Sequence, residues 1–120
     1  MDILKKRSDF LKTAKGLKYV SRGFVLQALE RNSAADTIID KSIRIGFTAS
    51  KKVGNAVCRN RAKRRLRELA RNIASPVAKT GYDYVFIARK NILAMEFNQL
   101  VSDVQQAMHK IHRAKKPNNR

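Results

Sequence analysis

The segment from Lys51 to Arg71, KKVGNAVCRNRAKRRLRELAR, combines a helical apolar stripe with a very unequal charge. Four apolar residues recur at spacings of four, three and four, and therefore share one face of a helix: Ala62, Leu66, Leu69 and Ile73. Nine Lys and Arg side chains stand in the segment against the single carboxylate of Glu68. A helix that only faces water usually mixes both signs. The segment predicts a helix from about residue 57 to 73, with Val57 less firmly on the apolar side, that docks on phosphates.

The charge is unbalanced over the whole chain, whose 120 residues carry a formal net charge of +18. Self-repulsion on that scale calls for a polyanionic partner. Hydrophobic residues make up 43% of the chain, enough for one modest core, so we expect one domain over residues 1–120 with a basic tail from about residue 113. Cys58 is the only cysteine, and no apolar run suits a signal peptide or a membrane span. These features predict a soluble cytoplasmic protein.

Periodicity along the chain predicts an α+β protein. Helices are expected from Ser8 or Asp9 to about Lys15, at 57–73 and at 95–112. Strands are expected at 22–30, 42–50 and 82–89. The stretch 31–41 is rich in turn-forming residues and is expected to hold a loop between strands, which ends near Ile38 or Ile39. The order of these elements favours a two-layer sandwich, in which three helices pack against a small sheet of about four strands.

The segment also carries a specific resemblance. The string KKxGNAVxRNRxKRxxRE, formed by residues between Lys51 and Glu68, resembles the signature of the bacterial ribonuclease P protein family. The resemblance extends over nearly the whole chain, including the YDYVFIARK strand and the closing amphipathic helix. It implies that the signature helix forms a left-handed crossover between parallel strands, although such connections are right-handed in about 98% of proteins.

The resemblance implies a protein subunit of the endonuclease that removes 5′ leaders from precursor tRNA. In that family a larger RNA subunit performs the hydrolysis with Mg²⁺ ions that the RNA mainly binds. We therefore expect no catalytic residues and no metal site in this chain. The expected partners are the catalytic RNA subunit and precursor tRNA, with no membrane and no obligatory protein partner.

The cationic side chains of the signature are the candidates for binding RNA. Lys and Arg neutralise phosphates and release condensed counterions, and Asn can donate and accept hydrogen bonds. The candidates are Lys51, Lys52, Arg59, Asn60, Arg61, Lys63, Arg64 and Arg67. Arg65 and Arg71 lie outside the signature and are left open. The alternative interpretation is a solvated basic face without a fixed partner.

A second candidate site follows from aromatic residues close to positive charge, a combination that binds single-stranded RNA by base stacking. In the family, the single-stranded leader lies in a cleft between the first helix and the sheet. The candidates in this chain are Phe10, Tyr19, Phe24, Gln27 and Lys90. Ala14 and Gln27 stand where relatives often carry aromatics, so the resemblance leaves the leader preference open. Phe10 and Phe24 could also be core residues, and Phe24 is the more typical of the core.

Other constellations are weaker. His109 and His112 are three apart on one predicted helix, yet the adjacent tail is cationic and disfavours a bound metal. The acidic residues are dispersed, with no local pattern typical of a two-metal nuclease. Two further function classes stay open: a structural nucleic-acid-binding protein, such as a small ribosomal protein, and a protein-only nuclease. The second would require carboxylates that this sequence does not bring together.

Overall fold

The computed structural model describes residues 2–31 and 42–113, which form one sheet and three α-helices. The strands are β1 (Asp2–Ile3), β2 (Leu17–Val20), β3 (Phe24–Glu30), β4 (Arg44–Ala49) and β5 (Tyr82–Ala88). The helices are α1 (Arg7–Thr13), α2 (Ala56–Leu69) and α3 (Phe97–Arg113). Shorter helical turns follow α2, as a π-helical turn at Ala70–Ala74 and a 3₁₀ turn at Ser75–Val77, and follow β5 at Lys90–Ala94. Most of the predicted loop at 31–41 lies outside the described residues.

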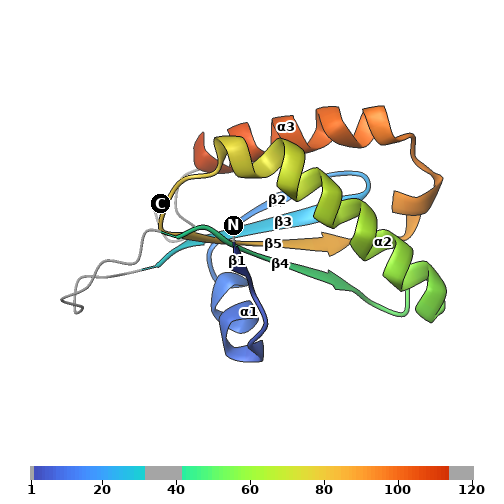
Figure 1. The fold of residues 1–120 in the computed structure, drawn as a ribbon, viewed down its shortest axis with the longest axis horizontal. Helices are drawn as coiled ribbons and strands as arrows, with labels where there is room; N and C mark the ends of the chain where they lie inside the picture. The colour runs from blue at the N-terminus through green and yellow to red at the C-terminus, as the bar shows by residue number, and fades with distance from the viewer. Residues whose placement is uncertain (1, 32–41, 114–120) are drawn as a thin grey trace.

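The strands lie in the order β1-β4-β5-β3-β2. β4 is parallel to β1 and to β5, whereas β3 is antiparallel to β5 and β2. The connection from β4 through α2 to β5 therefore joins adjacent parallel strands. In Figure 1, β4 lies in front of β5, and the chain returns above the sheet along α2 between them, which makes the crossover left-handed. The expectation drawn from the resemblance is thus met.

The sheet has a helical layer on each face (Figure 1). α2 and α3 cover one face, and the short α1 lies against the other. The expected two-layer packing describes the sheet with its two longer helices, while α1 adds partial cover on the second face. The sheet of the described residues has five strands rather than about four, because the short edge strands β1 and β2 carry too little periodic signal to be predicted.

The core lies between the sheet and the pair α2 and α3. Side chains alternate along β3, so that Phe24, Leu26 and Ala28 are fully buried on this face while Val25 and Gln27 are half-buried on the other. Leucines of α2 and α3 pack on the same cluster. Burying one such large apolar side chain stabilises the fold by about 1.5–3 kcal/mol. This core fixes the orientation of α2 relative to the sheet.

Candidate nucleic-acid interface

The turn before α2 determines where the basic helix begins. Asn55 precedes the helix, and its side-chain oxygen accepts a hydrogen bond from the Cys58 amide at 3.0 Å. Gly54 has φ of +143°, and a Cβ there would lie 2.8 Å from the Cβ of Cys58. The buried Val53 holds the turn against the core. The Gly-Asn pair of the signature therefore fixes where α2 begins, and so fixes the positions of the cations that follow on the helix.

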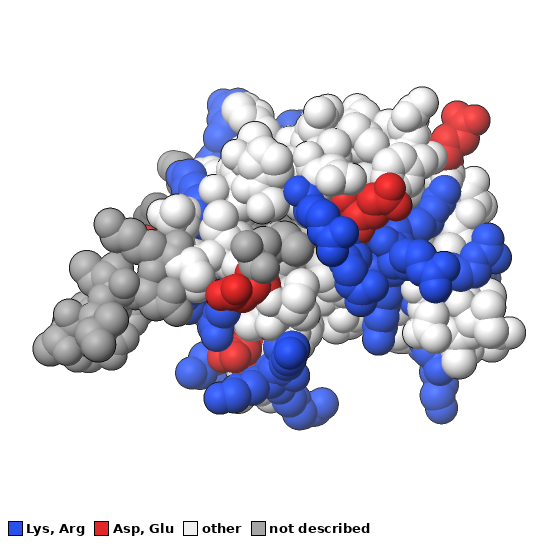
Figure 2. All heavy atoms as spheres, in the orientation of Figure 1, with Lys and Arg blue, Asp and Glu red and all other residues white. Residues whose placement is uncertain are grey.

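α2 divides its side chains between core and surface. Ala62, Leu66 and Leu69 are fully buried, as the spacing predicts, whereas Val57 is 66% exposed and lies outside the apolar face. Ile73 is half-buried in the π-helical turn rather than in α2 itself. Six signature residues are exposed: Lys51, Lys52, Asn60, Arg61, Arg64 and Arg67. Two more are half-buried: Arg59 and Lys63. Lys and Arg gather over α2 in Figure 2. We call these eight residues the α2 surface.

Some cations of this helix also make contacts within the protein. Arg65 donates from Nη1 to the carbonyl oxygens of Ile92 at 2.7 Å and Met95 at 2.8 Å, so it anchors the turn after β5. Arg59 donates to the Gly54 carbonyl at 2.9 Å. The guanidinium carbon of Arg67 lies 5.7 Å from the ring centroid of Phe47, within cation–π range. Arg65, which the sequence left open, is therefore a structural residue.

On the opposite face, Phe10 of α1 packs directly on the backbone of β4. A Cβ at Gly46 would lie 2.5 Å from Cζ of Phe10, so only glycine leaves room for the ring. Thr13, also on α1, is fully buried and donates its hydroxyl to the Asp9 carbonyl at 2.8 Å. α1 is therefore docked by close packing, and Phe10 has a fixed place beside the sheet.

An ion cluster ties α1 to β4, to β5 and to the residue that follows β3. The Asp83 carboxylate is buried and accepts from Arg31 Nη1 at 2.6 Å, from Arg44 Nε at 2.8 Å and from Arg44 Nη2 at 2.6 Å. Arg44 also pairs with Asp9 of α1 at 3.5 Å. Two-point pairing of a guanidinium with a carboxylate is strong and directional. The cluster therefore holds β4, β5, α1 and the end of β3 in one arrangement.

Comparison with known proteins identifies the family of this chain. A family model described as Ribonuclease P matches residues 2–112. The chain belongs to the ribonuclease P protein family. Among curated ribonuclease P protein components, that of Ruegeria pomeroyi is 44% identical over 96% of this chain and 90% of its own length. That of Paramagnetospirillum magneticum is 46% identical over 92% of this chain and 83% of its own length.

Solved structures of ribonuclease P proteins share the fold. The protein of Staphylococcus aureus is 29% identical, with a TM-score of 0.66 and coverage of 94% of both chains. The protein of Thermotoga maritima has a TM-score of 0.71 over 96% of this chain and 99% of its own, at 24% identity, and shows likeness of fold alone. The ribonuclease P protein is thus a component of an endoribonuclease.

The strand register brings two of the five predicted leader residues onto one face. Gly46, Val85, Gln27 and Lys18 pair across four neighbouring strands and point to the same side. Phe10 lies over the Gly46 end of this row, and Lys18 on β2 forms its other end. Strands are about 4.8 Å apart, so Gln27 lies about 10 Å from Gly46. We call Phe10, Gln27 and Lys18 the sheet row.

Two other predicted leader residues lie on the wrong face. Phe24 is fully buried, with its ring centroid 5.6 Å from that of Phe86 in the core, so it cannot stack with a base. Tyr19 pairs with Leu26 and packs against the same core. For Phe24 the prediction was wrong, because alternation along a strand turns adjacent residues to opposite faces and its ring is enclosed in the core, whereas a role for the half-buried Tyr19 stays a prediction. Lys90 is exposed just after β5, beyond the row.

The sequence did not single out a second group of cations around α1. Exposed residues there are Lys5, Lys6, Arg7, Lys12 and Lys15, and Figure 2 shows Lys and Arg gathered around this helix too. The dense run of Lys and Arg before and within α1 was the signal in the sequence that could have identified this group. Lys18 was missed for a different reason, since its position on the face depends on the unpredicted strand β2.

Residues 2–31 and 42–113 contain neither a cluster of metal ligands nor a membrane-spanning helix. No three or more His, Cys, Asp or Glu side chains gather there as ligands for an ion. His112 instead forms a hydrogen bond through Nε2 with the hydroxyl of Tyr84 at 2.6 Å. No helix in the same part of the chain is long and apolar enough to cross a bilayer.

Proposed function

We propose that this chain is the protein subunit of ribonuclease P, which binds the catalytic RNA subunit and the 5′ leader of precursor tRNA. The observation that supports it best is the α2 surface, where six signature residues are presented by a helix whose opposite side is locked into the core and two more by the turn before it. Only Glu68 brings negative charge to this helix. A rigid cationic helix suits phosphates that are themselves fixed in a folded RNA.

The α2 surface would bind the catalytic RNA subunit. Exposed Arg61 and Arg64 neutralise phosphates, and the exposed Asn60 before them offers a donor and an acceptor to the backbone or a base edge. Each phosphate contact releases counterions, so the binding constant falls steeply with salt. Lys51 and Lys52 extend this surface at the turn before the helix.

The sheet row would bind the leader. Phe10 offers a ring edge or face for a base, Gln27 an amide for hydrogen bonds, and Lys18 a cation for a phosphate. The three lie on one face, on the side opposite α2. A strand held there would leave the α2 surface available for the catalytic RNA. The substrate and the RNA subunit therefore bind different faces of the protein.

The hydrolysis is assigned to the RNA subunit, with Mg²⁺ bound mainly by RNA. The described carboxylates nearest the sheet row are already paired, since Asp83 binds Arg31 and Arg44 and Asp9 binds Arg44. A carboxylate committed to an arginine is a poor ligand for Mg²⁺. When bound, the ion supplies Lewis-acid chemistry at the scissile phosphate, and the protein contributes by holding the two RNAs. Such work on transcripts would place the protein in the cytoplasm.

The test is cleavage of a precursor tRNA at low Mg²⁺ by the protein alone, by the cognate catalytic RNA alone and by the two together. Activity restored only by the combination supports the proposal. Activity of the protein alone would indicate a protein-only nuclease. If the protein has no effect on the RNA, the basic helix belongs to a structural nucleic-acid-binding protein.

A further inference from the structure

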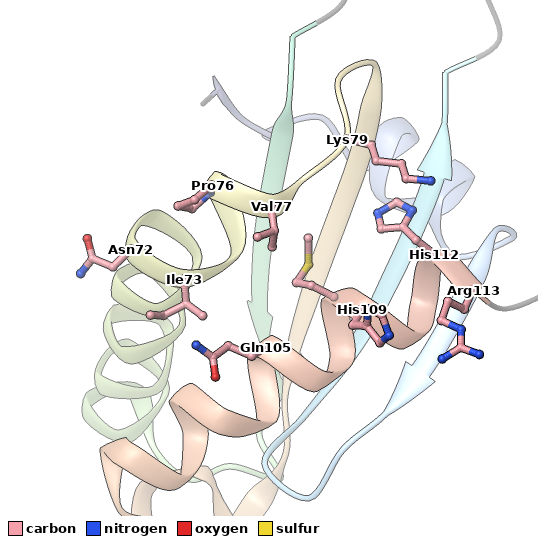
Figure 3. A pocket seen from close by; sticks show the side chains of 10 residues that line it. Asn72, Ile73, Pro76, Val77, Lys79, Gln105, His109, His112 and Arg113 are labelled. Atoms are coloured by element: carbon pink, nitrogen blue, oxygen red, sulfur yellow. The ribbon is translucent and has the colours of Figure 1, made fainter.

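A hollow of about 590 Å³ lies between the end of α2 and the last turns of α3. Figure 3 shows the residues that line it: Asn72 comes from the π-helical turn, Lys79 from the segment before β5, and Gln105 and Arg113 from α3. Both helices cover the face of the sheet opposite α1. The hollow is therefore separate from the sheet row.

The lining of the hollow is positively charged. Lys79 and Arg113 are among its ten residues, and none of the ten is acidic. Two helix C-termini point toward this end of the protein, and each carries a partial charge of about −0.5. The two cations exceed that sum, so the hollow favours an anionic group.

The lining also suits more than a bare phosphate. Met108, Ile73 and Val77 provide apolar surface, and the amides of Asn72 and Gln105 each offer donors and an acceptor. Pockets for small molecules commonly measure 300–1,000 Å³, with apolar walls and a few polar groups. A planar heteroaromatic ring with a phosphate attached uses all three kinds of surface.

One wall of the hollow is held by a hydrogen-bond chain. The Lys79 amide donates to the Tyr84 hydroxyl oxygen at 2.9 Å, and this hydroxyl lies 2.6 Å from Nε2 of His112. Burial raises the pKa of Tyr84 to about 12, so the phenol keeps its proton and donates it to His112. Burial, and then Lys79, lowers the pKa of His112, which favours the neutral ring with its own proton on Nδ1.

This arrangement leaves a polar atom without a partner. Nδ1 of His112 is buried and has no hydrogen-bond partner among the described residues. Unpaired buried groups are rare in proteins, and many mark a functional site. The π-helical turn at Ala70–Ala74, which forms another wall, is a rare element that also concentrates at functional sites.

We propose that this hollow binds a nucleotide, through phosphate contacts from Lys79 and Arg113 and base contacts from Asn72 and Gln105. The nucleotide is either a free mononucleotide or one residue of an RNA strand. The inference does not rest on the proposed function, because it uses neither the α2 surface nor the sheet row.

The experiment is a titration of the ¹⁵N-labelled full chain, followed by amide chemical shifts, with adenosine 5′-monophosphate and separately with single-stranded pentaadenylate. We expect saturable shifts at Asn72, Val77 and Gln105. In Lys79→Gln/Arg113→Gln the dissociation constant should rise about tenfold or more, as the loss of a charge-assisted contact predicts. Arg71→Gln/Lys110→Gln is the matched control, since it removes the same charge from exposed positions that do not line the hollow.

Val77→Trp provides a second test. Val77 is 60% exposed, so a larger side chain can fill the hollow with little cost to the fold, and binding should be lost. Loss of pentaadenylate binding in these variants identifies an RNA strand as the source, and loss of mononucleotide binding alone identifies a free nucleotide. Unchanged affinity in Lys79→Gln/Arg113→Gln would overturn the proposal. So would equal binding of inorganic phosphate and the mononucleotide. Neither result would alter the cleavage assay of the proposed function.

Discussion

The α2 surface and the sheet row are built in different ways. The α2 surface comes from one continuous segment, in which the helical repeat turns some residues toward the core and the others toward solvent. The sheet row joins residues of α1, β2 and β3 on a backbone platform that includes β4. The first depends on one helix and its start signal, and the second on strand register and on the docking of α1. Damage to the sheet should therefore affect the two surfaces unequally.

The largest effect is expected from Asp83→Asn. The change leaves Arg31 and Arg44 facing a neutral amide in a partly buried place. Removing one partner of a buried ion pair costs 3–5 kcal/mol, and we expect about 3 kcal/mol because both arginines keep some exposure. Chemical denaturation measures this. Glu68→Gln, an exposed carboxylate on α2, is the control and should change stability by less than about 0.5 kcal/mol. Equal effects of the two changes would show that the Asp83 cluster does not support the fold.

A pair of glycine substitutions separates the two surfaces. Gly46→Ala places a Cβ against the Phe10 ring and should displace α1, at about 1–3 kcal/mol of stability. Gly54→Ala instead disturbs the start of α2, since its φ of +143° disfavours any side chain. Filter binding should show weaker leader binding in the first variant and weaker binding of the RNA subunit in the second. If both variants weaken both RNAs alike, the surfaces are not independent.

Phe10→Ala tests the sheet row with less disturbance of the backbone. Loss of one stacked base should weaken binding of precursor tRNA by about 1–3 kcal/mol, while binding of mature tRNA, which has no leader, stays unchanged. Leu11→Ala is the control, because the neighbouring side chain is 53% exposed and is not part of the row. Equal losses for the two tRNAs would remove Phe10 from the leader site.

The sequence predicts these surfaces to different extents for a physical reason. The apolar spacing of α2 identified Leu66 and Leu69 as core and so left the cations outside, because the helical repeat is local. The face that a strand residue takes depends on its partners. Tyr19 and Phe24 were assigned to the leader site as aromatics, but their register with the core strands directs them to the other side. Lys18 could not be placed without β2.

The order of the remaining elements was predictable because their periodic segments are long. The helix ends were not, since the π-helical turn at Ala70–Ala74 continues the α2 pattern in a different geometry. The hydrogen-bond chain from Lys79 through Tyr84 to His112 joins residues far apart in sequence. No local spacing announces such a contact, and the hollow beside it was therefore absent from the sequence prediction.

The smallest effect is expected from single substitutions on α2, measured as the salt dependence of RNA binding. Arg61→Ala and Arg64→Ala each remove one exposed cation, and each should lower the slope of log binding constant against log salt by roughly 0.7–0.9 if one phosphate contact is lost. Binding of the RNA subunit should be measured across several salt concentrations. Lys110→Ala removes an exposed cation from α3 and should leave the slope unchanged. Unchanged slopes in both arginine variants would take these residues out of the interface. A slope that falls equally in Lys110→Ala would mean that overall charge, rather than the α2 surface, recruits the RNA.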